Sequence, residues 1–277
     1  MKKAVSTLSF LLLMSAVASA QNARPAGHTR AATAPSRRSD SDQTARLAKS
    51  NAGNAEAADK DDEVEQLLDR NVIALGGTAV FKIKSRIMRG SVEMSTSDVP
   101  GTFESYEKAP NKSLSVLNAP SGQFIQAYDG SKKWLQSPWG GMVATEQSGL
   151  EVVKQSLSKG SFRLKDLFSS ASIKGRAVVD GHATVVLAAT PVGRQPLLMY
   201  FDADTGLLRK QEFVNSGPPQ EVELKAVYID SYAQVDGVKI PVVFRQVYSV
   251  FTLTIRIYEV KDNVPIEDSL FENPKGN

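Results

Sequence analysis

The chain has 277 residues, of which 42% are hydrophobic and 23% charged, an ordinary composition for a soluble globular protein. It contains no cysteine, which excludes disulfides, a thiol nucleophile, thiolate metal ligands and a lipid-modified cysteine, and its two histidines are too few for a multi-histidine metal site. The formal net charge is +3 and falls to +1 if Lys2 and Lys3 are removed, so no basic face for nucleic acid is predicted.

Residues 1–20 have the pattern of a secretory signal peptide. Two lysines form a charged start, a short apolar run follows, and Ala18-Ser19-Ala20 is a small-residue cleavage site. An uncleaved membrane anchor is the alternative, but the apolar run is short for a span. We therefore expect a mature chain that begins at Gln21 and is exported to the periplasm, or secreted beyond it.

Residues 21–60 are rich in alanine, serine, arginine, asparagine and aspartate, and beyond alanine Leu47 is almost the only apolar side chain. Such a segment cannot bury enough apolar surface to offset the entropy of ordering it. We predict a disordered linker. Arg37 and Arg38 could contact anionic lipid or the cell wall, but a solvated tail is the simpler interpretation.

From Asp61 the pattern becomes that of a single folded domain, residues 61–277. Acidic residues suit the start of a helix, and Gly76-Gly77 supplies its end. A short second helix is predicted from Thr78 to Lys84. The first helix has apolar side chains at helical spacing, namely Val64, Leu67, Leu68, Val72 and Leu75.

Strands with strict alternation of apolar and polar side chains follow the helix. This period indicates an antiparallel sheet with one apolar face. The expected apolar sides are Met88, Gly90, Val92 and Met94; Val222, Leu224, Ala226 and Tyr228; and Phe251, Leu253, Ile255 and Ile257.

Turn signals separate the predicted strands. Asp129-Gly130, Asp180-Gly181 and Asp236-Gly237 are hairpin dipeptides. The clearest hairpin runs from Leu197 to Val214, with its loop at Asp202-Ala203-Asp204-Thr205-Gly206. Together these signals predict a sheet of roughly ten strands, built largely from hairpins.

One segment, Gly149 to Ser170, interrupts the strand pattern. Its apolar residues Leu150, Val153 and Leu157 recur at helical spacing. We predict a helical insertion between two groups of strands, and a mobile lid over the apolar face of the sheet. No internal repeat or second linker is visible, so a single domain is expected.

Candidate catalytic groups are few. His182 follows the turn at Asp180, and without a nucleophile elbow it is best interpreted as an exposed turn histidine. Asp202 and Asp204 lack the closing glutamate of a calcium loop, so a turn role suffices. With no phosphate-binding or dinucleotide motif either, the sequence predicts no catalytic residues, no metal, no cofactor and no enzyme.

An aromatic cluster beside glycine-rich backbone is more suggestive of binding. Tyr128, Trp134 and Trp139 lie within twelve residues of one another, beside Pro138, Gly140-Gly141 and Met142. Such side chains form either a pocket rim or ordinary core packing, and the sequence leaves both open. The candidates to line a ligand site are Trp134, Trp139, Met142, Leu150, Val153, Leu157, Leu253 and Ile255.

Four segments resemble motifs of one bacterial family. A helix closing on Ala74-Leu75-Gly76-Gly77, followed by Ile83-Lys84-Ser85, resembles the start of outer-membrane lipoprotein-sorting proteins. The matches span most of residues 64–260, and the motifs are mainly turn signatures. Three hairpins resemble that family's "YDGKxxW", "FDxxTGL" and "xDGVKxP" segments: Tyr128-Asp129-Gly130-Ser131-Lys132-Lys133-Trp134, Tyr200-Phe201-Asp202-Ala203-Asp204-Thr205-Gly206-Leu207-Leu208 and Val235-Asp236-Gly237-Val238-Lys239-Ile240-Pro241.

The resemblance is to the family of the periplasmic lipoprotein carrier and its outer-membrane receptor. It implies an α+β fold, mainly β: an incomplete antiparallel β-barrel of about eleven strands with a helical lid, whose concave apolar face binds acyl chains. Two departures are the long linker, which is untypical of the carrier, and the absence of the cysteine that anchors the receptor.

The expected function is a periplasmic binder or carrier of an acylated or apolar ligand, lipid or lipoprotein, without covalent chemistry. The alternative is an interaction or sensor module that uses the same sheet to bind a protein partner. Nucleic acid is not expected as a partner, and no integral membrane span is expected after signal cleavage.

Overall fold

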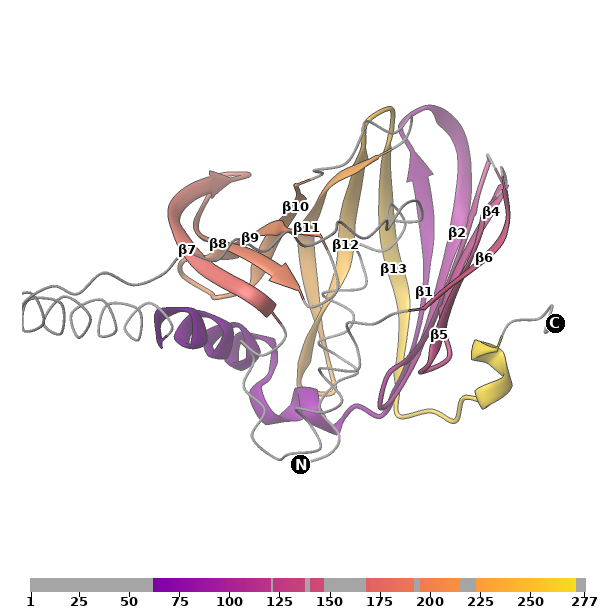
Figure 1. Ribbon diagram of the computed structural model, residues 1–277, viewed down its shortest axis with the longest axis horizontal. Coiled ribbons are helices and arrows are strands. Elements are labelled where there is room, and N and C mark those ends of the chain that lie inside the picture. The colour runs from indigo at the N-terminus through magenta and orange to yellow at the C-terminus, as the bar shows by residue number, and fades with distance from the viewer. Residues whose placement is uncertain are drawn as a thin grey trace, which may run out of the picture.

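The computed structural model describes residues 62–120, 122–137, 140–146, 168–191, 195–214 and 223–272, with the backbone alone for residues 137 and 140–146. The signal and linker expected at residues 1–60 lie outside this part of the chain. The described residues form one thirteen-stranded antiparallel sheet (Figure 1). Its strands are β1 (Ser85–Met94), β2 (Ser97–Lys108), β3 (Lys112–Ala119), β4 (Gly122–Tyr128), β5 (Lys132–Ser137), β6 (Gly140–Glu146), β7 (Phe168–Val179), β8 (His182–Pro191), β9 (Leu197–Asp202), β10 (Leu208–Phe213), β11 (Leu224–Val235), β12 (Val238–Tyr248) and β13 (Thr252–Asp262).

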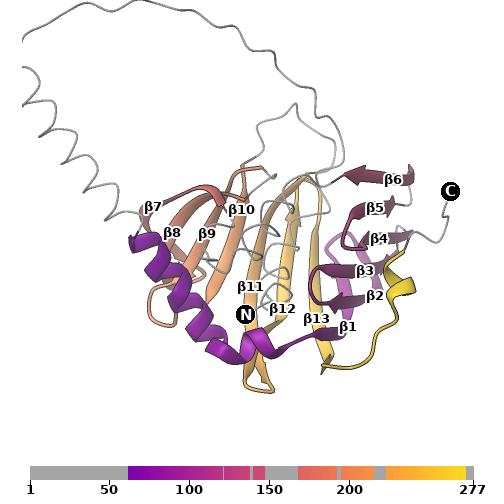
Figure 2. The same cartoon turned by 60° about the horizontal axis from the view of Figure 1, so that its bottom comes forward.

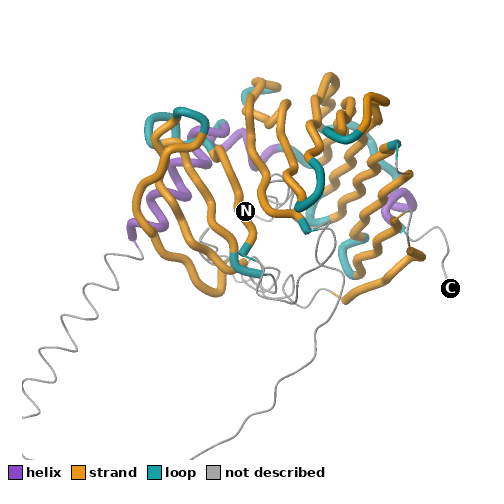
Figure 3. The backbone as a smooth tube through the Cα atoms, turned by 90° about the horizontal axis from the view of Figure 1, so that it is seen from above, coloured by secondary structure: helices purple, strands orange, loops and turns teal. Residues whose placement is uncertain are grey.

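The strand order shows two meanders joined at one seam. The order is β6-β5-β4-β3-β2-β1-β13-β12-β11-β10-β9-β8-β7, so the first and last strands of the sheet in sequence are neighbours in space. Between β6 and β7 the chain passes from one edge of the sheet to the other. Seen from above, the sheet is curved and open (Figure 3). The expected incomplete antiparallel barrel is confirmed, with thirteen described strands rather than about eleven.

The N-terminal helix, residues 62–75, lies across the β7–β11 part of the sheet and leads through the 3-10 helix η2 (Gly77–Lys82) into β1 (Figure 2). All five apolar residues predicted for its core-facing side are at most 8% exposed. The helix ends at Gly76, whose φ of 130° favours glycine, and whose Cα lies so close to the Gly237 carbonyl that no Cβ would fit. The predicted helix and its stop are confirmed.

Two-residue turns close the hairpins β7–β8 and β11–β12. At both, an aspartate with φ near 48° precedes a glycine with φ near 82°: Asp180 at 47° and Gly181 at 83°, Asp236 at 48° and Gly237 at 81°. Positive φ at both positions defines the type I′ turn, whose twist matches that of the flanking strands. Asparagine or aspartate followed by glycine is the sequence signature of this turn, which is why these hairpins were predictable.

The two faces of the sheet bury different sets of side chains. The inner face packs against the N-terminal helix and carries the main hydrophobic core, which includes Met88, Phe103 and Ile255. The outer face carries a smaller cluster around Trp134, covered by the C-terminal segment that ends in the 3-10 helix η4 (Asp268–Phe271). Alternation along β1–β5 assigns each side chain to one face or the other.

Two sequence interpretations of the strands were wrong. Ala226 and Tyr228 were assigned to the apolar side of β11, but a bulge between Leu224 and Ala226 shifts the alternation, so that Val227 and Ile229 join Leu224 in the inner core. Phe168–Ser170, assigned to the helical insertion, begin strand β7 by pairing with the end of β8. Both errors arise because strand register depends on partners distant in the sequence.

Candidate functional site

The inner face is apolar where the two meanders meet. Val92 on β1 pairs with Ile255 on β13, and Ile255 pairs with Phe244 on β12. All three side chains are at most 1% exposed. The ring of Phe103 on β2 meets the ring of Phe244 edge-on, with centroids 6.1 Å apart and planes at 83°. The apolar surface therefore continues across the seam, from β2 to β12.

Gly90 lies on β1 between these aromatic residues and keeps the seam closely packed. A Cβ at Gly90 would lie 2.5 Å from the Arg256 carbonyl oxygen and 3.1 Å from the Ile257 side chain. Beside Gly90, β13 has a bulge between Ile257 and Glu259, the partners of Gly90 and Arg89. Only glycine fits the inner face at this position.

Toward the start of β1 the inner face becomes polar. Arg86 pairs across the strands with Asp262 on one side and Glu107 on the other. The Arg86 guanidinium donates two hydrogen bonds to the Asp262 carboxylate, Nε to Oδ1 at 2.7 Å and Nη2 to Oδ2 at 2.9 Å. Arg86 is 1% exposed and Glu107 3%. This is a buried ion pair with an additional carboxyl group beside it.

Glu107 is held in an unusual state by these surroundings. Burial raises the pKa of the Glu107 carboxyl, Arg86 lowers it and Asp262 raises it, and the result is a pKa of about 8 against an ordinary value of 4.5. Its carboxyl group is therefore mostly protonated at neutral pH, and it has a hydrogen to donate.

The predicted ligand-lining residues do not all lie together. Leu253 and Ile255 belong to the inner core, at 4% and 0% exposure. Trp134 is on the outer face, where its Nε1 donates to the Phe271 carbonyl oxygen at 3.1 Å, so it shares no surface with those two residues. The remaining candidates, Trp139, Leu150, Val153, Leu157 and the side chain of Met142, lie outside the described residues.

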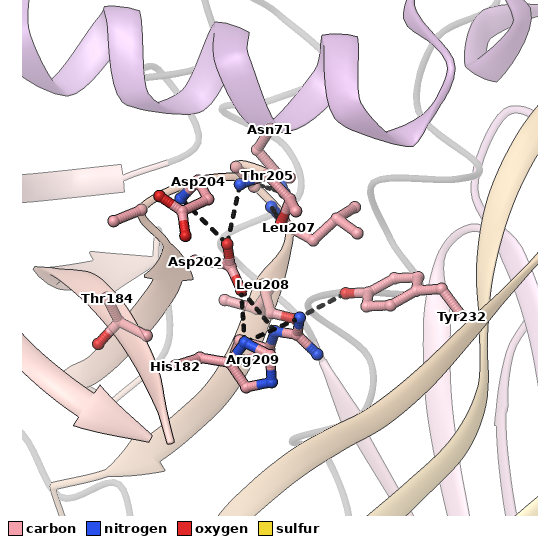
Figure 4. A network of polar contacts seen from close by, with 12 residues as sticks. Asn71, His182, Thr184, Asp202, Asp204, Thr205, Leu207, Leu208, Arg209 and Tyr232 are labelled. Carbon is pink, nitrogen blue, oxygen red and sulfur yellow. Dashed lines mark hydrogen bonds and ion pairs between the residues drawn. The ribbon is translucent and has the colours of Figure 1, made fainter. Parts of the chain in front are cut away.

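The loop of the β9–β10 hairpin contains a compact polar network (Figure 4). Asp202 Oδ1 accepts from the backbone nitrogens of Thr205 at 2.8 Å and Asp204 at 3.1 Å, and Asp202 Oδ2 accepts from Arg209 Nε at 2.9 Å. Burial raises the pKa of Asp202, but the hydrogen bonds from Thr205, Arg209 and Asp204 outweigh it and lower the pKa to about 2. The aspartate is a turn residue, as its sequence context indicates.

His182 contacts the same carboxylate, with Nδ1 3.2 Å from Asp202 Oδ2 and the side chain about half exposed. The hydroxyl of the nearby Thr184 donates to the Ala177 carbonyl at 3.0 Å. Asn71 and Arg70 of the N-terminal helix donate to loop carbonyls, Asn71 Nδ2 to Gly206 at 2.8 Å. The hydrogen bonds from Asn71 and Arg70 therefore hold the β9–β10 loop against the N-terminal helix.

A recess of about 890 Å³ lies at the start of β1, beside the C-terminal segment. Lys82 and Lys84 line it together with Lys108, which donates to the Ile266 carbonyl and pairs with Asp268 at 2.6 Å. Its lining residues Ser85 and Lys108 belong by alternation to the outer face, and no residue of the apolar inner core lines it.

Two further observations cover only part of the chain. Within residues 62–272, where described, no group of three or more histidine, aspartate or glutamate side chains is placed to hold a metal ion. In the same described part, no helix is both long enough and apolar enough to cross a membrane.

The sequence analysis did not single out Arg86, Glu107 and Asp262, the charged residues at the start of β1. Arg86 has the same parity as Met88, so alternation alone places it on the apolar face, where a charge is unexpected. Its partner Asp262 lies 176 residues away, beyond a β13 bulge, and nothing local in the sequence indicates the pairing.

No protein-family profile and no curated protein matches this sequence. Several solved structures do match the structure of this chain. A DUF1329 family protein from Desulfovibrio piger is 15% identical, with 73% of this chain and 97% of that chain covered and a TM-score of 0.48. A LolA superfamily protein from Nitrosomonas europaea is 13% identical over the same shares of each chain, also at 0.48. A domain of an outer membrane lipoprotein-sorting protein from Vibrio parahaemolyticus is 13% identical, covering 75% and 95%, again at 0.48.

Proposed function

We propose that this protein binds and carries an acylated or otherwise apolar ligand in the periplasm, by burial on the inner face of its sheet and without covalent chemistry. The observation that carries the proposal is the inner face itself. It is apolar on both sides of the seam, from Phe103 to Phe244, and it belongs to a curved sheet whose edges β6 and β7 have no strand partner among the described residues.

The energy of acyl burial is sufficient for useful affinity. Each buried CH₂ contributes about 0.8 kcal/mol, so ten methylenes contribute about 8 kcal/mol before the cost of association. A lining without fixed polar contacts accepts chains of different lengths, as a carrier requires. The resemblance of the sequence motifs to lipoprotein-sorting proteins supports the same proposal.

The test compares two adjacent residues of β3 that point to opposite faces. Leu117 packs against the inner core, whereas Val116 packs against the outer cluster, and both are partly buried. We expect Leu117→Glu to weaken binding of a neutral apolar dye, N-phenyl-1-naphthylamine, by more than tenfold, because a carboxylate on the inner face opposes apolar burial. The matched control Val116→Glu should bind the dye as wild type does.

Native mass spectrometry of the protein purified from the periplasm complements the dye. Co-purified lipid is the expected result. Repeated absence of lipid together with no dye binding by the wild-type protein would refute the carrier proposal. Equal loss of dye binding in both variants would show that the inner face is not the site.

A second candidate is a module that binds a protein partner. The observation in its favour is edge strand β7, twelve residues long, on which Val178 is 73% exposed. An edge strand offers unpaired backbone groups to another chain. Crosslinking that captures one dominant protein, from a preparation that contains no lipid, would favour this candidate over the carrier.

A further inference from the structure

The recess at the start of β1 is separate from the apolar inner face on which the proposed carrier function rests. Its volume is about 890 Å³, and it lies between the end of η2, the β1–β2 pair and the segment that follows β13. That segment leaves the sheet beside β1 and runs to η4 (Figure 2). No residue of the inner core lines the recess, so a ligand bound there would occupy a second site.

Hydrogen bonds fix the walls of the recess. Asn263 N donates to the Ser85 carbonyl oxygen, and Lys84 N donates to Asn263 Oδ1, both at 2.8 Å. On the other side, Ala109 N donates to the Lys84 carbonyl oxygen at 2.7 Å. Asn263 has a φ of 57°, a left-handed conformation that asparagine adopts more readily than most residues. Because its amide oxygen is used in the wall, the Asn263 Nδ2 group is left as a donor.

Two of the three lysines that line the recess have no counter-charge. Lys108 pairs with Asp268 at 2.6 Å. Lys82 and Lys84 are exposed, and in the part of the chain that the structure describes neither side chain makes an ion pair or hydrogen bond. Glu267 is the one carboxylate among the lining residues, and it forms no ion pair with either lysine. The uncompensated positive charge favours an anion in the recess.

The remaining lining indicates which anion fits. Ala109 and Pro110 on one side and Val264 and Pro265 on the other give the recess an apolar wall beside its lysines. The lining contains no arginine, whose planar fork suits a carboxylate, and no aromatic ring on which a nucleobase could stack. Lysine binds phosphate as a point charge. A phosphate that carries an apolar substituent matches both parts of the lining.

We propose that this recess binds a phosphate ester with an apolar substituent, with Lys82 and Lys84 contacting the phosphate oxygens, Asn263 Nδ2 donating to one of them, and the substituent packed on Val264 and Pro265. The ester is either the phosphate of a membrane lipid or a soluble alkyl phosphate, which present the same chemistry to the recess. The site lies outside the inner face and does not depend on the carrier function.

The experiment measures binding of hexyl phosphate, inorganic phosphate and hexanoate to the full mature protein by titration calorimetry. We expect hexyl phosphate to bind about tenfold more tightly than inorganic phosphate, the effect of about two buried methylenes, and more tightly than hexanoate. The double variant Lys82→Gln with Lys84→Gln should weaken hexyl phosphate about tenfold, the sum of two exposed ion pairs. Lys82→Arg with Lys84→Arg keeps both charges and should stay within about threefold of wild type.

The matched control is Lys174→Gln with Arg176→Gln on β7. Both side chains are exposed cations without an ion pair in the described part of the chain, and β7 is the edge strand farthest from β6 in the sheet order. This variant removes the same net charge and should bind hexyl phosphate as wild type does. An equal loss in the two glutamine variants would show general attraction of anions and overturn the site.

Vesicles distinguish the two sources of the ester. If wild type sediments with phosphatidylglycerol vesicles but not with phosphatidylcholine vesicles, and the Lys82→Gln/Lys84→Gln variant does not, the lipid phosphate is the ligand. Binding of hexyl phosphate without vesicle binding assigns the site to a soluble ester. No binding of hexyl phosphate or vesicles, or tighter binding of hexanoate, would overturn the proposal. N-phenyl-1-naphthylamine binding should be unchanged in the variant, so failure of this site and failure of the carrier function are separate results.

Discussion

Glu107 is a residue whose protonation couples pH to the stability of the fold. Its pKa is raised from 4.5 in its ordinary state to about 8, chiefly by burial. Between these values the folded state holds a proton that the unfolded state releases, so the free energy of unfolding falls as pH rises through this window. The total loss is on the order of a few kcal/mol. We expect urea unfolding to show a stability difference between pH 5 and pH 8 that largely disappears in Glu107→Gln.

The control for this prediction is Glu104→Gln, because Glu104 lies on the outer face of the same strand. Its pH profile should run parallel to that of the wild type. If the pH profile of Glu107→Gln also ran parallel to that of the wild type, Glu107 would not be protonated in the folded state. The Asp202 carboxyl, whose pKa is lowered to about 2, acts in the opposite sense. Its contribution to the free energy of unfolding is present above about pH 4 and is lost as pH falls below that value.

Among single residues, the sequence reveals those whose role is local. Asp202 and the turn aspartates are recognisable because their partners lie within a few positions of them. Arg86 and Glu107 are not recognisable, because their environment is created by strands that pair only after the chain has folded back. The sequence also does not show which face of the sheet Trp134 points to, because a tryptophan fits either face.

The C-terminal segment is an element that acts as a strap on the outer face. Phe271 is fully buried against the Trp134 cluster, and Lys108 and Lys112 hold Asp268 at 2.6 and 3.1 Å. We expect Phe271→Ala to release the strap, expose Trp134 and shift its fluorescence emission to longer wavelength. The loss of stability should be about 3 kcal/mol, at the low end for a buried phenylalanine, because a strap can detach without opening the sheet.

Leu270→Ala is the control for the strap, because Leu270 is in the same 3-10 helix but 39% exposed. It should leave both the emission and the stability near wild type. Any contribution from Trp139 is common to all the variants. An unchanged emission maximum in Phe271→Ala would contradict the assigned packing of Trp134 under the strap.

Whole elements were predictable where the signal is periodic and local. The helix at residues 62–75 has its apolar stripe and its glycine stop in one short segment, and the type I′ turns have their dipeptides. Bulges are different, because one extra residue is accommodated only against a particular partner strand. The bulge in β11 therefore reversed the predicted facing of Ala226 and Tyr228, and no propensity of those residues signals it.

At the scale of the molecule, the fold depends on a seam that the sequence does not show. The strand pattern divides into two groups, as predicted, but the pairing of β1 with β13 joins residues more than 150 positions apart. The inner core draws on both meanders, with Met88 and Phe103 from one and Phe201 and Phe244 from the other. We propose that the meanders therefore form a single folding unit.

The seam at Gly90 provides the test of that unity. Gly90→Ala would place a methyl group 2.5 Å from the Arg256 carbonyl oxygen, so β1 and β13 must separate slightly along the seam. We expect a loss of ~2 kcal/mol, typical of an overpacked core, and a melting temperature lowered by about 4–8 °C. The neighbouring Ser91→Ala, on the outer face, is the control and should change the stability little.

Hydrogen–deuterium exchange in increasing urea then follows the unfolding of each meander by itself. Because both share one core, peptides from β3–β4 and from β9–β10 should lose protection at the same midpoint, and Gly90→Ala should lower both midpoints equally. If the β9–β10 peptides kept their protection after β3–β4 had lost theirs, the two meanders would be separate folding units that meet at the seam.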